Sequence, residues 1–203
     1  MVNKESEVKY YVSDLDPIKQ RLENLGAILI HPRIHELNIR YDSNDHRLST
    51  YGHVLRLRND TKARITYKSE SRYESGVHVR DEIELVVDDF DIAQKLLSSI
   101  GFQILMIYEK YRTTFNWNET HITLDEMPFG DFIEIEGSEP ARILHVNNEI
   151  GLDWSVRILE SYTTLFEKLK DSQGYKFRDL TFENFYGLEI IPEMLNVKPA
   201  EKF

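Results

Sequence analysis

Charged side chains at alternating positions are the feature that most constrains this chain. In a β-strand, residues two positions apart point to the same face. That spacing recurs in one segment after another, as in Glu5-Ser6-Glu7-Val8-Lys9 and Arg80-Asp81-Glu82-Ile83-Glu84. Leu55 and Leu57 alternate with Arg56 and Arg58 in the same way. The pattern predicts strands with one charged face and one apolar face.

The order of the predicted elements favours an α+β fold. Pro17 is suited to the first turn of a helix and Gly26 to its end, and other helices follow apolar positions at helical spacing. Strands are predicted at 4–12, 28–41, 53–59, 62–69, 77–88, 102–117, 120–126 and 131–136, and helices at 17–24, 89–100, 140–149 and 155–170. Eight strands with short connections predict an antiparallel sheet, closed into a barrel with helices packed outside.

Both signs of charge occur on the predicted strands in equal number. Such a pattern is also typical of the solvent-exposed face of an amphipathic sheet. Three observations favour another interpretation: the charges recur on nearly every strand, their side chains are long, and the two signs balance. The basic residues are Lys9, Arg56, Arg58, Lys68, Arg80, Lys110 and Arg112, and the acidic residues are Glu5, Glu7, Glu82, Glu84, Asp125, Glu134 and Glu136.

The predicted helices decide which face of the sheet points inward. They are amphipathic and need an apolar surface to cover, which the apolar faces of the strands supply. The charged faces then line the interior, where charges are costly unless they are paired or bound to a ligand. A metal–polyphosphate complex suits such an interior, because carboxylates bind Mg²⁺ or Mn²⁺ while arginine and lysine bind phosphate oxygens.

Composition excludes several other classes of protein. The formal net charge of −10 disfavours general nucleic-acid binding, and the absence of cysteine excludes thiolate zinc sites, disulfides and cysteine nucleophiles. The seven histidines show no H-E-x-x-H spacing. No apolar run reaches the roughly 18–20 residues that span a bilayer, and the N-terminus lacks a signal-peptide pattern. We therefore expect a cytoplasmic protein without a membrane partner.

A series of short motifs resembles the CYTH superfamily, also called the triphosphate tunnel metalloenzymes. That family takes in class IV adenylyl cyclases, thiamine triphosphatases and inorganic triphosphatases. Glu5-Ser6-Glu7-Val8-Lys9 matches its E-x-E-x-K signature. Further motifs follow in the family's order over residues 4–137, namely Leu55-Arg56-Leu57-Arg58, Thr66-Tyr67-Lys68, Arg80-Asp81-Glu82-Ile83-Glu84, Lys110-Tyr111-Arg112, Asp125 and Gly130-Asp131-Phe132-Ile133-Glu134-Ile135-Glu136.

The resemblance implies an eight-stranded tunnel domain over residues 1–175 and a role for each charged residue. Glu82 and Glu84 orient the basic groups or assist a metal, and Lys9 is the candidate to help activate the nucleophile. The implied ligands of Mg²⁺ or Mn²⁺ are Glu5, Glu7, Asp125, Glu134 and Glu136. The implied triphosphate path is lined by Lys9, Arg56, Arg58, Lys68, Arg80, Lys110 and Arg112.

One position departs from the family pattern. Family members often carry two aromatic residues before the aspartate of the second strand, where this chain has Arg40-Tyr41-Asp42. In some triphosphatases the tyrosine at the first of these positions is thought to activate water with the signature lysine. Arg40 cannot act as that tyrosine. It either adds a phosphate contact or faces outward.

Three functions follow from the resemblance. The first is hydrolysis of an inorganic, thiamine or nucleoside triphosphate, and the second is conversion of ATP to cyclic AMP and pyrophosphate. These differ in the nucleophile, which is water in the first and the ribose 3′-hydroxyl in the second. The third is a non-catalytic sensor of polyphosphate or nucleotide, which would not need so many carboxylates. Residues 176–203 are interpreted as a lid or a packed tail, and a homodimer is left open.

Overall fold

The strands form one antiparallel sheet that closes into a ring. This computed structural model describes residues 3–202, without the side chains of residues 3–5, Tyr73 and His78. The sheet order is β1-β9-β8-β7-β2-β3-β4-β6-β5. The strands are β1 (Asn3–Val12), β2 (Ile28–Ser43), β3 (Val54–Asn59), β4 (Ala63–Lys68), β5 (Arg72–Glu74), β6 (Val77–Val87), β7 (Phe102–Trp117), β8 (Thr120–Met127) and β9 (Gly130–Gly137).

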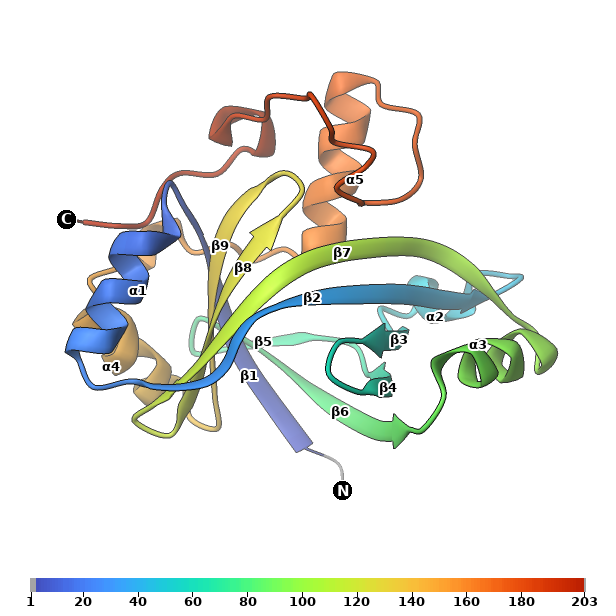
Figure 1. Cartoon of the computed structure of the whole chain (residues 1–203), viewed down its shortest axis with the longest axis horizontal. Helices are drawn as coiled ribbons and strands as arrows, with labels where there is room; N and C mark the ends of the chain where they lie inside the picture. The colour runs from blue at the N-terminus through green and yellow to red at the C-terminus, as the bar shows by residue number, and fades with distance from the viewer. Residues whose placement is uncertain (1–2, 203) are drawn as a thin grey trace.

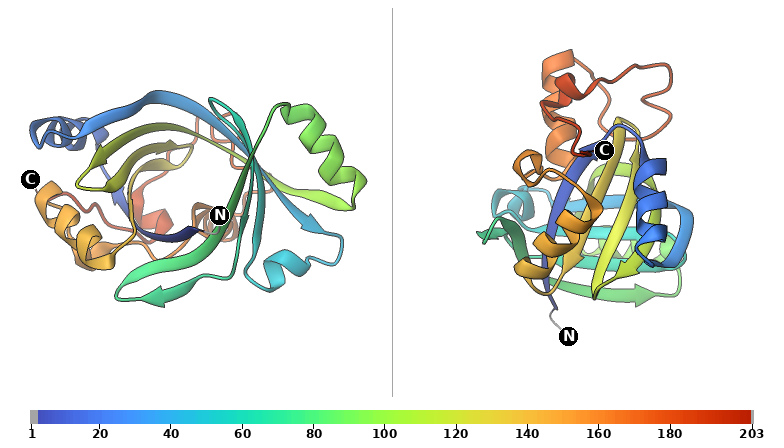
Figure 2. Two further views of the ribbon diagram at one scale, coloured as in Figure 1. Left: turned by 90° about the horizontal axis from the view of Figure 1, so that it is seen from below. Right: turned by 90° about the vertical axis from the view of Figure 1, so that its left-hand side faces the viewer.

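The ring closes because β1 pairs with β9 on one side and with β6 on the other. Eight strands therefore make up the ring, while β5 pairs with β6 beside it. The left view of Figure 2 looks through the ring. The predicted eight-stranded, closed antiparallel sheet is confirmed. The short β5 was not predicted, because three residues are too few to show a period.

Three helices cover the outer face of the ring, as predicted. α1 (Leu15–Asn24) and α4 (Pro140–Ile150) pack on β1, β8 and β9, and α3 (Phe90–Ser99) packs on β3, β4 and β7 (Figure 1). Ala93 and Leu97 of α3 lie in one apolar cluster with Leu57 of β3. Asp14 and Asp89 cap α1 and α3 by accepting hydrogen bonds from backbone N–H groups. The apolar strand faces thus point outward, and the charged faces point into the ring.

α5 (Tyr162–Gln173) lies over one end of the ring (Figures 1 and 2). The helix predicted at 155–170 is wrong in its first part, where the chain forms a short 3₁₀ turn, η1 (Trp154–Val156), and then an extended segment. Ile158 donates its N–H to the carbonyl of Lys9 at 2.8 Å and so pairs with β1 in an antiparallel bridge. Ser161 caps the true helix by accepting from the N–H of Thr164 at 3.1 Å. A second short helix, α2 (Arg47–Thr50), was also not predicted.

The C-terminal segment packs against the body of the molecule. Leu180 exchanges hydrogen bonds with β7, accepting from the N–H of Glu109 at 3.0 Å and donating to the carbonyl of Ile107 at 2.9 Å. A 3₁₀ turn, η2 (Pro192–Leu195), follows, and Ala200 donates to the carbonyl of Tyr11 at 3.0 Å. The segment therefore reaches β7 and β1 and holds α5 over the ring.

Within residues 3–202, every helix is too short or too polar to cross a membrane.

Candidate active site

A cavity of about 510 Å³ occupies the interior of the ring and is lined mainly by charged side chains. The strand period explains this lining, because the charged positions of each strand alternate with apolar positions that pack under the outer helices. Its basic residues are Lys9, Arg40, Arg56, Arg58, Lys68, Arg80, Lys110 and Arg112, and its acidic residues are Glu7, Glu82, Glu84, Glu134 and Glu136. The cavity is therefore basic, although the whole chain is acidic.

Lys9 is held in place at the β1 wall of the cavity. Its Nζ lies 3.1 Å from Oε1 of Glu134, donates to the carbonyl of Glu160 at 3.3 Å, and stands 4.1 Å from the ring centre of Tyr162. Burial raises the pKa of Glu134, but Lys9 and Arg112 outweigh that effect and hold the pKa well below its usual range. Glu134 is thus an anion that pairs with Lys9 at the wall of the cavity.

Asp125 lies behind the cavity wall and is fully buried. Its oxygens accept hydrogen bonds from Lys110 Nζ at 3.0 Å, from Arg112 Nε at 2.6 Å and from the Tyr162 hydroxyl at 2.9 Å. Predicted as a metal ligand, Asp125 is not among the residues that line the cavity. Its contacts position two cations that do line the cavity.

Glu36 is a site residue that the sequence analysis missed. It is 2% exposed, and its oxygens lie 3.7 Å from Lys110 Nζ and 3.7 Å from a terminal nitrogen of Arg58. Burial raises the pKa of Glu36, but Lys110, Arg112 and other arginines lower it to below its usual range. The sequence could have indicated Glu36, because Glu36, Asn38 and Arg40 occupy alternate positions of β2, as the charged residues of the other strands do.

On the opposite wall, three more of the predicted cations, Lys68, Arg58 and Arg80, each pair with an acid. Lys68 Nζ lies 2.7 Å from Glu82, and a terminal nitrogen of Arg58 donates to Glu84 at 3.0 Å. Arg80 donates to Glu7 of β1 at 3.4 Å. Glu82 and Glu84 therefore form ion pairs with basic residues of the cavity, and their implied roles of orienting these groups or assisting a metal stay predictions.

Arg40 faces into the cavity and not outward, while the phosphate contact that the sequence left open stays a prediction. One of its terminal nitrogens donates to Oγ1 of Thr163 at 2.8 Å. Its neighbour Arg56 donates to the hydroxyl of Tyr108 at 3.4 Å. Burial raises the pKa of Tyr108, but Arg56 and Lys110 lower it further than burial raises it. The arginine that replaces an expected tyrosine is thus part of the site.

Carboxylates at the β1–β9 wall fit a hard divalent cation. Glu7 and Glu136 are direct cross-strand partners, and both line the cavity. Like charges in such positions repel each other unless a cation lies between them. Mg²⁺ commonly uses one or two carboxylates together with water and phosphate oxygens. Among the side chains that the structure describes, no three from His, Asp and Glu are already gathered as a metal site.

The structure describes the backbone of Glu5 but not its side chain. Its backbone pairs with that of Arg80, next to the position of Glu7, while its side chain is not among those described. The predicted role of Glu5 as a metal ligand therefore stays a prediction.

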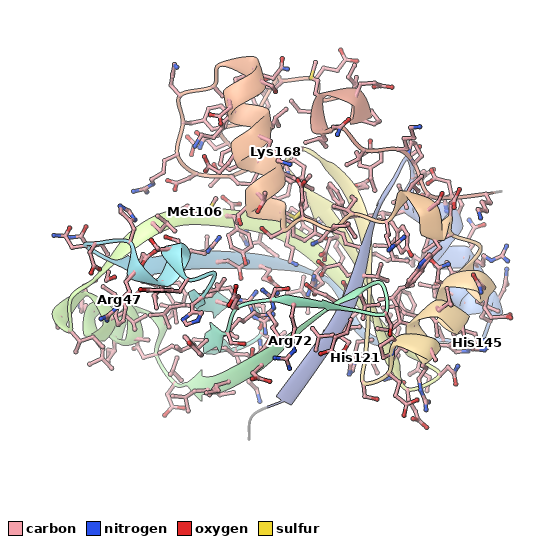
Figure 3. All side chains as sticks on the ribbon, turned by 180° about the vertical axis from the view of Figure 1, so that it is seen from behind. Arg47, Arg72, Met106, His121, His145 and Lys168 are labelled. Atoms are coloured by element: carbon pink, nitrogen blue, oxygen red, sulfur yellow. The ribbon has the colours of Figure 1, made fainter. Side chains whose placement is uncertain are left out.

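Two further segments line the cavity and were missed by the sequence analysis. Residues 161–164, at the start of α5, enter it from one end, and Ser49, Gly52 and His53 border it near α2. Neither segment is a strand, so the alternating charge pattern carried no signal for them. His121 and His145, by contrast, are exposed side chains on β8 and α4 (Figure 3).

Comparison with known proteins places this ring in a family. The CYTH domain model matches residues 3–175. A candidate adenylate cyclase from Vibrio parahaemolyticus superposes with a TM-score of 0.72 at 22% identity, covering 82% of this chain and 99% of that chain. A protein from Pyrococcus horikoshii gives a TM-score of 0.65 at 26% identity, covering 81% and 99%.

A third structure is a candidate adenylyl cyclase from Hippeastrum whose description reports a dominant triphosphatase activity. It gives a TM-score of 0.62 at 18% identity and covers 85% of this chain and 97% of that chain. No curated protein matches the sequence. Because the domain model spans most of the chain and these structures share its ring of strands, the chain belongs to the CYTH domain family.

Proposed function

We propose that the chain is a divalent-metal-dependent triphosphatase. The observation that carries the proposal is one cavity in which basic side chains from six strands face carboxylates of β1 and β9. A triphosphate is a ligand that satisfies both halves of this lining, because its oxygens accept from the basic groups and share a metal with the carboxylates. The Hippeastrum structure, described as a triphosphatase, gives the same activity for a relative of this fold.

The basic side chains bind the triphosphate and stabilise the charge that develops during phosphoryl transfer. In the proposed reaction the oxygen of a water molecule bonds to the terminal phosphorus. The bridging P–O bond breaks, its electron pair stays on the diphosphate oxygen, and that oxygen takes one proton from the water. We assign to Lys9, whose Nζ lies 3.1 Å from Glu134, the roles of orienting the water and offsetting negative charge on the transferred group.

We propose Glu7 and Glu136, with Glu134 and with Glu5 two positions before Glu7, as the ligands of Mg²⁺ or Mn²⁺. The bound ion supplies Lewis acidity and neutralises phosphate charge. We assign Asp125 to a different task, that of holding Lys110 and Arg112, because it does not line the cavity and its oxygens accept from those two cations and from Tyr162.

Adenylyl cyclisation is the second candidate, and the Vibrio structure named as a candidate cyclase favours it. A cyclase needs a nucleoside pocket beside the triphosphate. The described aromatic rings that line the cavity are His53, Tyr108 and Tyr162. Two of them are engaged, since Tyr108 contacts Arg56 and Tyr162 contacts Lys9. This leaves little free aromatic surface for stacking a base, which supports hydrolysis over cyclisation.

Product analysis tests the proposal. The protein is incubated with tripolyphosphate, thiamine triphosphate and ATP, each with Mg²⁺ and separately with Mn²⁺. We expect orthophosphate release that stops on chelation and in Glu134→Ala, while Glu119→Gln, at an exposed position, retains it. Cyclic AMP with pyrophosphate would establish the cyclase instead. Binding without any product would indicate a sensor, and neither binding nor product would overturn all three functions.

A further inference from the structure

Tyr162 is the first residue of α5 and lines the cavity from the end that this helix covers. The residue is 7% exposed, and its ring packs edge-on against that of Phe132 in β9, with ring centres 5.0 Å apart. Ser161, the residue before it, caps the helix by accepting from the N–H of Thr164 at 3.1 Å. A packed ring on a capped first turn is a rigid support for neighbouring side chains.

The ring of Tyr162 stands beside two cations of the cavity wall. Lys9 Nζ lies 4.1 Å from its ring centre, and Lys110 Nζ lies 5.3 Å from it. An ammonium group over an aromatic face is attracted by the ring electrons, most strongly where water is excluded. Both lysines are buried. The ring therefore attracts both ammonium groups without adding a charge of its own.

The hydroxyl of Tyr162 holds the ring in its orientation. It donates at 2.9 Å to Oδ2 of Asp125, the oxygen that also accepts from Lys110 Nζ at 3.0 Å. Burial, followed by the charge of Asp125, raises the pKa of Tyr162 well above its usual range. The hydroxyl therefore keeps its proton and remains a donor to Asp125.

The contacts of Lys9 leave one of its N–H groups for a ligand. A lysine ammonium group carries three N–H donors. Among the described residues, Glu134 lies 3.1 Å from Lys9 Nζ, and the carbonyl of Glu160 accepts from it at 3.3 Å. These two acceptors account for two donors, and the third remains for a water or a phosphate oxygen. Glu160 lies two residues before Tyr162, so one short segment supplies both the carbonyl and the ring.

We propose that Tyr162 is a positioning residue for Lys9, through which α5 takes part in the reaction. This inference rests on the proposed function, in which Lys9 orients the water and offsets charge on the transferred group. The ring, with Glu134 and the carbonyl of Glu160, confines the ammonium group to one position on the flexible lysine stem. Without the ring the ammonium group is free to move, and a displacement of about 1 Å in a reacting site can cost about 100-fold in rate.

Steady-state kinetics test this role by separating the ring from the hydroxyl. The substrate is whichever of tripolyphosphate, thiamine triphosphate and ATP the wild type hydrolyses fastest, with Mg²⁺ or Mn²⁺. Tyr162→Leu removes the ring and should lower kcat about 10- to 100-fold, while KM changes by less than about 3-fold. Tyr162→Phe keeps the ring beside Lys9 and should retain kcat within about 3-fold of the wild type.

Phe166→Leu is the matched control for looser packing of α5. Phe166 is a fully buried aromatic residue one turn further along the helix, lies outside the cavity lining, and packs against Phe177 and Phe185. Its kcat should equal that of the wild type. Thermal melting shows that each variant is folded at the assay temperature, and Tyr162→Met takes the place of Tyr162→Leu if the latter is not.

The remaining outcomes each contradict a defined part of the argument. Equal losses of kcat in Tyr162→Leu and Phe166→Leu, or a loss in KM alone, would overturn the positioning role. A Tyr162→Phe variant as slow as Tyr162→Leu would overturn the assignment to the ring. Unchanged kcat in Tyr162→Leu, with an active wild type, would overturn the role of Tyr162 and leave the proposed function standing. Absence of orthophosphate release by the wild type would instead overturn the proposed function itself.

Discussion

Asp125 shows how a single buried carboxylate organises part of the cavity. It is fully buried and accepts from Lys110, Arg112 and Tyr162. A buried ion pair adds little net stability compared with apolar packing, but removing one partner leaves the other charge buried and unpaired. The position of Lys110 and Arg112 therefore depends on a residue that does not line the cavity.

We predict that Asp125→Asn lowers the free energy of unfolding by up to about 3–5 kcal/mol, because Lys110 and Arg112 lose the anion that they share and keep only Glu36 and Glu134 respectively. Urea unfolding followed by circular dichroism measures the change. Glu119→Gln is the control, since Glu119 pairs with Arg142 at 2.6 Å but has a side chain that is 79% exposed. Loss of that pair should change the free energy of unfolding by less than about 1 kcal/mol. Equal effects of the two variants would contradict the anchoring role.

Asp131 provides a residue-level prediction about pH. Burial, followed by the charges of Glu126 and Asp14, raises its pKa to about 6. Glu126 is also its direct cross-strand partner. Since the folded state holds this proton more tightly than the unfolded state, the wild type loses stability as the pH rises from about 4, the unfolded pKa, to about 6.

Asp131→Asn removes that charge and should raise the free energy of unfolding at pH 7.5 by about 1 kcal/mol, a value reduced for the partial exposure of the side chain. At pH 4 the wild-type carboxyl is protonated, and the difference between variant and wild type should disappear. Urea unfolding at both pH values measures it. A variant that is stabilised equally at pH 4 and pH 7.5 would show that charge is not the cause.

At the level of elements, the C-terminal segment contributes an aromatic cluster to the packing of α5. Phe185 is 5% exposed, and its ring centre lies 5.3 Å from that of Phe177 and 6.0 Å from that of Phe166. Phe129, which precedes β9, lies 6.2 Å from it. The segment after α5 is thus part of the core that holds the helix over the ring.

Phe185→Ala should lower the free energy of unfolding by about 3–5 kcal/mol, because it leaves a cavity in this cluster. The adjacent Tyr186 is 91% exposed, so Tyr186→Ala serves as the control and should change stability by less than about 0.5 kcal/mol. Chemical denaturation of both variants measures the difference. A loss below about 1 kcal/mol in Phe185→Ala would mean that the segment packs only loosely.

Elements in which residue types repeat at strand or helix spacing over many positions were predictable from the sequence, and elements without such a repeat were not. The long strand at 102–117 was predicted with the bounds that the structure has, because its alternation extends over many residues. The start of α5 was misplaced by seven residues, since the apolar spacing of 155–161 also suits a helix. Pairing of Ile158 with Lys9 overrides that local preference. The residue pattern of a short segment does not reveal that the segment pairs with a strand far away in the sequence.

The same limit applies to the site. Residues on alternating strand positions, such as Arg56 and Glu134, could be assigned to the interior from sequence. Tyr162 and Thr163 could not, because they reach the cavity from the first turn of a helix. Glu36 follows the same alternation and could have been assigned to the interior as well. The sequence therefore predicts the walls of the cavity better than it predicts the end covered by α5.

At the level of the whole molecule, a ligand in the cavity touches strands from all sides of the ring. Tripolyphosphate at 100 times its dissociation constant should raise the free energy of unfolding by about 2.7 kcal/mol. Urea unfolding measures this, and hydrogen exchange should slow in β1 and β3 together. Arg56→Ala, with weaker binding, should need more ligand for the same stabilisation. Slower exchange confined to one strand would contradict binding inside the ring.

Closure of the ring also has a consequence for synthesis on the ribosome. β1 precedes both of its partners, β6 and β9, in the chain, and Ala200 hydrogen-bonds to Tyr11 at its end. Non-local pairing of this kind is slow to form. The nascent chain must therefore carry β1 with an unpaired edge until β9 has been translated. During that interval the unpaired edge of β1 can pair with other chains, which a bound chaperone would prevent.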